Sequence, residues 1–210
     1  MASYQGHLTF SSLLAAGYGT LGAWQFDLDW GPVFLGAGLT ALGGLAPDLD
    51  SDSSVPVREL FGLAAVAVPL LFFRRLLRHG FSAEQTLVLL AGAYLFIRYP
   101  LAALFKSLTV HRGMFHSIPA MLVGGLAIFL LYHNPEVRWR LYLAGGFMLG
   151  FLSHLVLDEI YAVDFLGFKL KANKYSGSAL KFFSPSWAAT LGTYFLLGIL
   201  GYLAWLDLGK

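Results

Sequence analysis

The chain has 210 residues, of which 57% are hydrophobic and 12% are charged, and its mean hydropathy is +0.66. The charged fraction is about half that of an average soluble domain, which indicates an integral membrane protein without a soluble domain. A net charge of +2, with 14 Lys and Arg spread along the chain, provides no basic face for nucleic acid. The absence of cysteine excludes thiolate ligands, so any metal must be bound through nitrogen and oxygen.

Apolar runs of about twenty residues, the length that crosses a bilayer, recur along the whole chain. They predict an all-α, polytopic transmembrane helical bundle that forms one domain over residues 1–210, with helices at 7–25, 31–47, 59–78, 83–107, 117–133, 140–160 and 187–206. The expected number is about seven, with six to eight as the range, since Pro69 and Pro100 favour a kink or a re-entrant turn. Glycines inside the runs, as in "GAGLTALGG" (36–44), predict close helix packing.

Seven crossings place the connecting segments alternately at the two ends of the bundle. The end that carries the N-terminus receives residues 1–6, 48–58, 108–116 and 161–186, and with them most of the polar chemistry. The other end receives four tryptophans that are typical of an interfacial aromatic belt: Trp24, Trp30, Trp139 and Trp205. Lys and Arg divide almost evenly between the ends, so they favour neither orientation in the membrane.

Two short motifs offer metal-ligand spacing. His154 and Asp158 are four residues apart on one predicted helix and therefore share a face, where they either bind one ion or simply hydrogen-bond each other. Asp48 and Asp50 alternate about Leu49 in a segment that we expect to be extended, so both carboxylates can face a cation. A helix-ending turn is the alternative for this second motif.

The stretch "HRGMFHS" (111–117) holds two of the six histidines. Ser117 is followed closely by a proline and is predicted to be the N-cap of the next helix, whose free N–H groups would face the histidines and favour an anion. Arg112 would donate two parallel hydrogen bonds to a phosphate or a carboxylate. The alternative is that His111 and His116 only cap or snorkel at the interface.

Together these segments gather candidate nitrogen and oxygen ligands at one end of the bundle: His7, Asp48, Asp50, His111, His116, His154 and Asp158. Seven ligands are too many for one tetrahedral zinc ion. They fit two divalent ions that share a carboxylate, with zinc favoured and manganese or iron as alternatives. His79 and His133 fall at the opposite end and are expected to be interfacial.

Two further features have open roles. Arg98 lies within the fourth predicted helix, where it can pair with an acidic ligand, bind substrate or snorkel. The lysine-containing loop 161–186 is expected either to fold over the site as a lid or to remain a solvated linker.

Four motifs in this order resemble the YdjM family of bacterial inner-membrane proteins, which are described as metal-dependent hydrolases and sometimes as LexA-binding. The motifs are "GHLTFS" (6–11), "LAPDLD" (45–50), "HRGMFHS" (111–117) and "GFLSHLVLD" (150–158). The resemblance implies a multi-pass protein of the inner membrane, with metal-site roles for the same seven residues, and its pattern also includes Arg112 and Ser117. The chain departs from the pattern in two extra apolar spans before the third motif and in "SDSS" after "PDLD", where the family often has a histidine.

The hypothesis that we favour is a membrane-embedded metal-dependent hydrolase that cleaves a phosphoester of a lipid or amphiphile with a metal-activated water. We expect catalytic roles for Arg112, Ser117 and Asp50, and substrate binding by Arg112 and Arg98. One alternative is a metal-independent lipid phosphatase with a histidine nucleophile. Another is a non-enzymatic metal-binding protein or a divalent-ion transporter, whose ligands should lie near the membrane midplane.

Overall fold

The computed structural model describes residues 3–26, 28–50, 54–103, 114, 116–166, 169–172 and 180–209. For residues 49–50, 54–60, 163–166 and 169–172 it describes the backbone alone. The structural statements that follow concern these parts of the chain.

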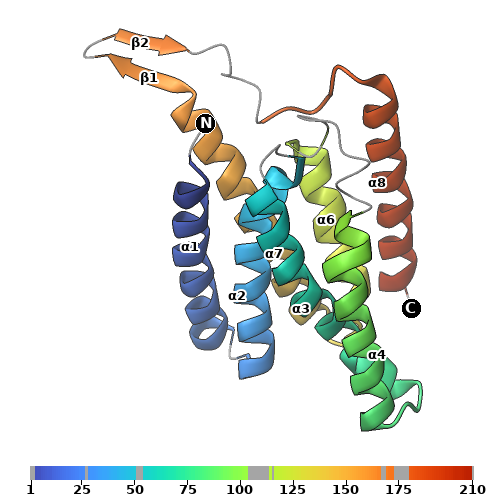
Figure 1. Cartoon of the computed structure of the whole chain (residues 1–210). Coiled ribbons are helices and arrows are strands. Elements are labelled where there is room, and N and C mark those ends of the chain that lie inside the picture. Colours follow the sequence, from blue (N-terminus) through green and yellow to red (C-terminus); the bar gives the residue numbers. More distant parts are fainter. Residues whose placement is uncertain are drawn as a thin grey trace.

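The protein folds as a helical bundle, as the sequence predicts (Figure 1). Its long helices are α1 (Tyr4–Gln25), α2 (Trp30–Leu45), α3 (Ser54–Arg78), α4 (Ala83–Phe96), α6 (Ile118–Leu131), α7 (Val137–Tyr161) and α8 (Trp187–Leu208). Figure 1 shows α1 and α8 on the two flanks, with the N-terminus at one end of the bundle and the C-terminus at the other. This placement of the termini agrees with the alternating helix directions expected from the sequence.

Helix α7 is the centre of the bundle and packs against α1, α2 and α6. It approaches α2 so closely that a Cβ at Gly150 would overlap the carbonyl oxygen of Thr40, and one at Gly43 would overlap that of Phe147. A Cβ at Gly44 would likewise overlap the side chain of Ser11 on α1. The glycines thus permit backbone contact among three helices, which confirms the predicted close packing.

Toward the end of the bundle opposite the N-terminus, two sets of polar contacts join the helices. The Tyr18 hydroxyl donates to the carbonyl oxygen of Tyr142 at 2.6 Å, and the Tyr142 hydroxyl donates to that of Tyr18 at 3.1 Å, so α1 and α7 are linked reciprocally. The buried Arg140 guanidinium pairs with Asp207 near the end of α8 and donates from Nε to the carbonyl oxygen of Phe129 at 3.0 Å. These contacts fix α7 between α1 and the α6–α8 pair.

The structure bears on three points of local structure that the sequence analysis raised. The "APDLD" segment is the 3₁₀-helix η1 (Ala46–Asp50), which tightens the end of α2, so the expectation of an extended segment is wrong and the alternative of a helix-ending turn is nearer. Helix α4 passes into a π-helical turn, η2 (Ile97–Leu101), because Pro100 cannot donate to the helical ladder, and the irregularity expected at this proline is present. Helix α3, in contrast, continues through Pro69.

The loop after α7 contains an antiparallel hairpin of β1 (Val163–Leu166) and β2 (Lys169–Ala172), where no strand was predicted. The hairpin extends α7 beyond the end of the bundle, away from α6 and α8 (Figure 1). The described hairpin therefore does not form the lid that was one of the two expectations for this loop. Residues 173–179 lie outside the described part of the chain.

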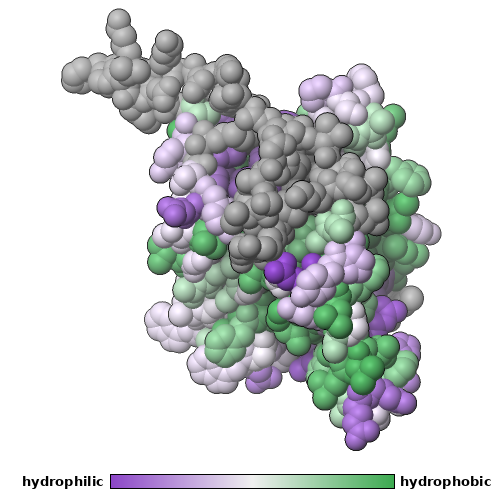
Figure 2. Space-filling view, in the orientation of Figure 1, coloured by the Kyte–Doolittle hydropathy of each residue, from purple (hydrophilic) through white to green (hydrophobic). Residues whose placement is uncertain are grey.

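Much of the surface formed by the described helices is apolar. Figure 2 shows hydrophobic side chains over α4 and α8 and hydrophilic ones at the turn between α3 and α4. Within the described residues, α7 and α8 have the length and composition needed to cross a membrane, and α6 is a shorter apolar helix. On α8, the exposed Trp187 and Trp205 are about 27 Å apart along the helix axis, which is close to the thickness of the hydrocarbon core.

Candidate metal centre

Five of the seven predicted ligands converge near the end of the bundle that carries the N-terminus. They come from four segments that are distant in the sequence: His7 on α1, Asp48 on η1, His116 just before α6, and His154 and Asp158 on α7. Their ligand atoms form two groups, each within 4.8 Å: His7, His154 and Asp158, and Asp48, His116 and His154. The geometry therefore fits the metal centre inferred from spacing.

His154 is held in one tautomer. Its Nδ1 donates to the carbonyl oxygen of Gly44 at 2.8 Å, and because a carbonyl only accepts, Nδ1 must carry the proton. In the neutral ring the lone pair is then on Nε2, which is buried and has no hydrogen-bond partner among the described residues. Histidines that bind a metal through one ring nitrogen typically donate the N–H of the other to a carbonyl or a carboxylate, as His154 does here.

The His154 lone pair faces two carboxylates. Nε2 is 3.6 Å from Asp48 Oδ1 and 3.8 Å from Asp158 Oδ2, both longer than a hydrogen bond. Two ligands on a tetrahedral ion, each about 2.0–2.1 Å from it, lie about 3.4 Å apart. The separations therefore suit a shared cation better than direct hydrogen bonding.

His116 completes this group. Its Nε2 is 3.9 Å from Asp48 Oδ1 and 3.9 Å from Asp158 Oδ2, and its ring meets that of His154 edge-on, with centroids 5.5 Å apart. The His116 ring and Asp158 are buried, whereas the Asp48 side chain is 19% exposed. Asp48 therefore marks the side from which water reaches the group.

His7 approaches Asp158 from the other side. Its Nε2 lies 3.1 Å from Asp158 Oδ1, a distance that fits a hydrogen bond, and its ring stacks on that of His154 with centroids 3.7 Å apart. The two oxygens of Asp158 thus face different partners, Oδ1 facing His7 and Oδ2 facing His116 and His154. A carboxylate with this arrangement can bridge two ions. The 3.1 Å between His7 Nε2 and Asp158 Oδ1 is also a distance expected for two ligands of one ion.

Backbone groups that the sequence reasoning missed support the cluster. Gly44 supplies the carbonyl that fixes His154, and Gly150, one turn before His154, lets α7 lie against α2 at the distance this bond needs. A glycine immediately before "LAPDLD" and another four residues before the histidine were the available signals.

The start of α6 differs from its prediction. Ser117 is its N-cap, as expected: Oγ accepts from the Ala120 N–H at 3.2 Å and donates to the Met114 carbonyl at 2.6 Å. However, the Ile118 N–H donates to the carbonyl oxygen of Lys181 at 3.1 Å, and Pro119 has no N–H. The first turn therefore has no free N–H group for an anion, and the Ser117 hydroxyl is committed to capping.

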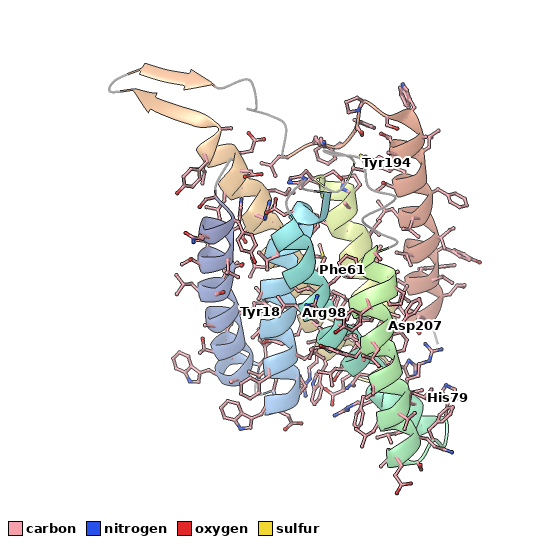
Figure 3. All side chains as sticks on the ribbon, in the orientation of Figure 1. Tyr18, Phe61, His79, Arg98, Tyr194 and Asp207 are labelled. Carbon is pink, nitrogen blue, oxygen red and sulfur yellow. The ribbon has the colours of Figure 1, made fainter. Side chains whose placement is uncertain are left out.

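The remaining predicted residues are not joined to the cluster by the described contacts. Arg98 is half-buried, beside α3, where its Cζ is 3.9 Å from the position of a Cβ at Gly62, and Figure 3 places it about halfway along the bundle. His111, Arg112 and the side chain of Asp50 lie outside the described residues.

Two histidines were predicted to be interfacial and not ligands, and both lie outside the cluster. His79 and His133 are both exposed. Figure 3 shows His79 at the far end of the bundle, by the turn after α3. Their position makes His133 a suitable control for the substitutions proposed below.

The fold and the cluster together define a helical membrane protein with a buried histidine–aspartate centre near one end of its bundle. The chain belongs to the YdjM inner membrane protein family, whose model matches residues 1–170, from the N-terminus to β2. The resemblance drawn from four motifs is thereby confirmed, and α8 lies beyond the matched residues. No curated protein and no solved structure matches the chain.

Proposed function

We propose that the protein is a membrane-embedded metal-dependent hydrolase whose metal is bound by the cluster of His7, Asp48, His116, His154 and Asp158. The observation that carries the metal is the buried Nε2 of His154, whose lone pair faces two carboxylates. Lone pairs that face one another repel, and a cation between them removes that repulsion. A mixed imidazole and carboxylate set suits zinc, manganese or iron.

A protonated His154 would explain the geometry less well. With Nδ1–H donated to Gly44, a second proton on Nε2 would need an acceptor within about 3.2 Å, whereas the two carboxylate oxygens are 3.6 Å and 3.8 Å away. A buried donor without an acceptor is costly. We therefore take Nε2 as a ligand atom.

We further propose that two ions are bound and that Asp158 bridges them. One ion would be held by Asp48, His116, His154 and Oδ2 of Asp158, and the other by Oδ1 of Asp158 and His7. Asp50 and His111 remain candidates for the second ion on the basis of the sequence.

Divalent ions in such a centre supply a water activated for attack and a Lewis-acid contact to a phosphoryl or carbonyl oxygen. The chain's own residues hold and orient the ligand side chains: Gly44 fixes the His154 ring, and stacking against His154 fixes the His7 ring. We favour a phosphoester because Arg112 stands four residues before His116 and can donate two parallel hydrogen bonds to an anion. The start of α6 does not add to this preference, since its N–H groups are already bonded.

We also propose that the protein crosses the inner membrane several times. Beyond α7 and α8, the outer faces of α1, α2 and α4 carry large exposed hydrophobic residues such as Leu13, Phe34 and Val88. The cluster then lies near one interface, where an amphiphile presents its polar head. This position is unlike the midplane site expected of a transporter.

The test is the metal content of the detergent-purified protein, measured by inductively coupled plasma mass spectrometry. Wild type would be compared with His154→Ala and Asp48→Asn, with His133→Ala as the control for an exposed histidine. We expect bound divalent metal in wild type and His133→Ala and a loss in the other two, followed by hydrolysis of amphiphilic phosphoesters by the metal-loaded form. Absence of metal from wild type after incubation with zinc or manganese would overturn the proposal and favour a histidine-nucleophile phosphatase.

A further inference from the structure

A cavity lined by apolar residues lies beside the cluster. It has a volume of about 280 Å³ and is bounded by α6, α7, α8 and the end of α2. Its inner wall includes Ala46, Met114 and Phe151, all of which are buried. Each of these residues is close in sequence to a cluster residue, being two or three positions before Asp48, His116 or His154.

The cavity runs from the buried interior toward the outer surface. Its outer wall includes Val123 on α6 and Thr193 on α8, which are half-buried, and Leu196 on α8, which is 44% exposed. Helix α8 packs against α6, and its outer face carries exposed Leu191 and Phe195. In a membrane, such a face contacts lipid chains, so the mouth at Leu196 lies in the hydrocarbon region.

The wall selects an apolar occupant. The lining residues carry no charge, and the one hydroxyl among them, that of Thr193, donates to the Ala189 carbonyl within α8 at 2.9 Å. A polar molecule would lose its hydration there and gain no hydrogen bond from these side chains. A hydrocarbon chain has no hydrogen bonds to lose there, and it would bury apolar surface.

We propose that this cavity binds the hydrocarbon chain of the substrate, with the polar head at the histidine–aspartate cluster. This assignment rests on the proposed function and adds the substrate class: a slender, single-chain amphiphile, or one chain of a lipid, that enters sideways between α6 and α8. The α8 part of the wall lies beyond the residues that the family model matches, so it is a feature of this chain that the family match does not assign.

The test is photolabelling of the full-length, metal-loaded protein in maltoside micelles with dodecyl phosphate that carries a diazirine at the end of its chain. Because the head lies at the cluster, the end of the chain should reach the outer wall, so we expect labelled peptides around Val123 and Gly124 and around Thr193 to Leu196. Thr193→Trp fills the cavity from α8, and Leu203→Trp, at an exposed position on the same helix, is the matched control. Because each methylene withdrawn from an apolar site weakens binding about fourfold, excluding two or three methylenes should lower labelling at least tenfold in Thr193→Trp.

Val123→Phe fills the cavity from α6 and gives a second variant in case Thr193→Trp does not fold. Labelling confined to the outer faces of the helices, or unchanged in both filled variants, would overturn the assignment. Metal content is measured in the same samples and is expected to be unchanged in all three variants. Failure of the metal centre would therefore appear as metal-free wild type, and failure of this inference as metal-loaded protein that is not labelled in the cavity.

Discussion

The carbonyl oxygen of Gly44 accepts a hydrogen bond from Nδ1 of His154 at 2.8 Å, across the interface of α2 and α7. This bond makes the metal centre depend on how closely two helices approach. It also means that a residue that supplies no ligand atom can control metal binding.

Gly150→Ala should therefore weaken metal binding. The new Cβ would overlap the Thr40 carbonyl, push α7 away from α2 and lengthen the bond to Gly44. Loss of such a second-shell bond typically costs about 10–100-fold in metal affinity. Competition with a chelator measures the affinity, and Gly192→Ala on α8, where nothing lies within 4 Å of the added Cβ, should behave as wild type. Equal affinities for Gly150→Ala and wild type would show that the bond does not control the site.

If Asp158 bridges two ions, the number of bound ions should separate two variants. Asp158→Asn removes the charge that both ions share, so it should lose both equivalents. His7 faces one oxygen of Asp158, so His7→Ala should lose one metal equivalent. Metal analysis of both variants against wild type gives the counts, and one equivalent in wild type that persists in His7→Ala would restrict His7 to orienting Asp158.

Ser117→Ala should lower stability and leave the metal content intact. The substitution removes the N-cap of α6, whose loss typically costs about 1 kcal/mol, and Ser117→Thr should restore most of it. Thermal unfolding in detergent measures the difference. A catalytic role for Ser117 would instead appear as lost hydrolysis in Ser117→Ala at normal metal content, with no comparable loss of stability.

Arg140→Met should destabilise the packing of α8. It leaves Asp207 without its partner, and breaking a buried ion pair costs about 3–5 kcal/mol, with the lower value expected because the Asp207 side chain is 27% exposed. The double variant Arg140→Met with Asp207→Leu leaves no unpaired charge and should recover much of the loss. Unfolding midpoints of the two variants test this, and equal midpoints would assign the effect to the contacts of Arg140 with Phe129.

Removing the reciprocal tyrosine bonds should affect stability alone. The double variant Tyr18→Phe and Tyr142→Phe keeps the stacked rings and removes both hydroxyls, at about 1 kcal/mol for each bond. Thermal unfolding should show the loss while metal content stays constant, since the pair and the cluster lie toward opposite ends of α7. A change in metal content would reveal coupling along α7.

Hydrophobic run length was sufficient to predict the helices and their alternation, because crossing a bilayer constrains both. That alternation by itself places His7, His116 and Asp158 at one end of the bundle. Local backbone geometry was harder to predict. The segment "APDLD" is η1, which packs against α2, α3 and α7, and the sequence does not show these contacts. The interstrand bonds of the hairpin arise between residues that carry no strong strand pattern.

Contacts made by backbone atoms could not be predicted from the sequence either. Gly44 and Lys181 accept hydrogen bonds through their backbone carbonyls, which every residue has. The residue type at these positions therefore gives no sign of the bonds. The prediction that α6 begins with free N–H groups was wrong for this reason, although its N-cap, Ser117, was correct.

The bond from the Ile118 N–H to the Lys181 carbonyl has a consequence for how the chain can be divided. A protein truncated after Ala172 would keep the five clustered ligands and all of the residues that the family model matches, and yet it would lose the acceptor that closes the first turn of α6, two residues from His116. The C-terminal part is thus not a separable appendage. In its evolution, any lengthening or loss of that part would have to preserve a backbone acceptor at this point, whatever side chain carries it.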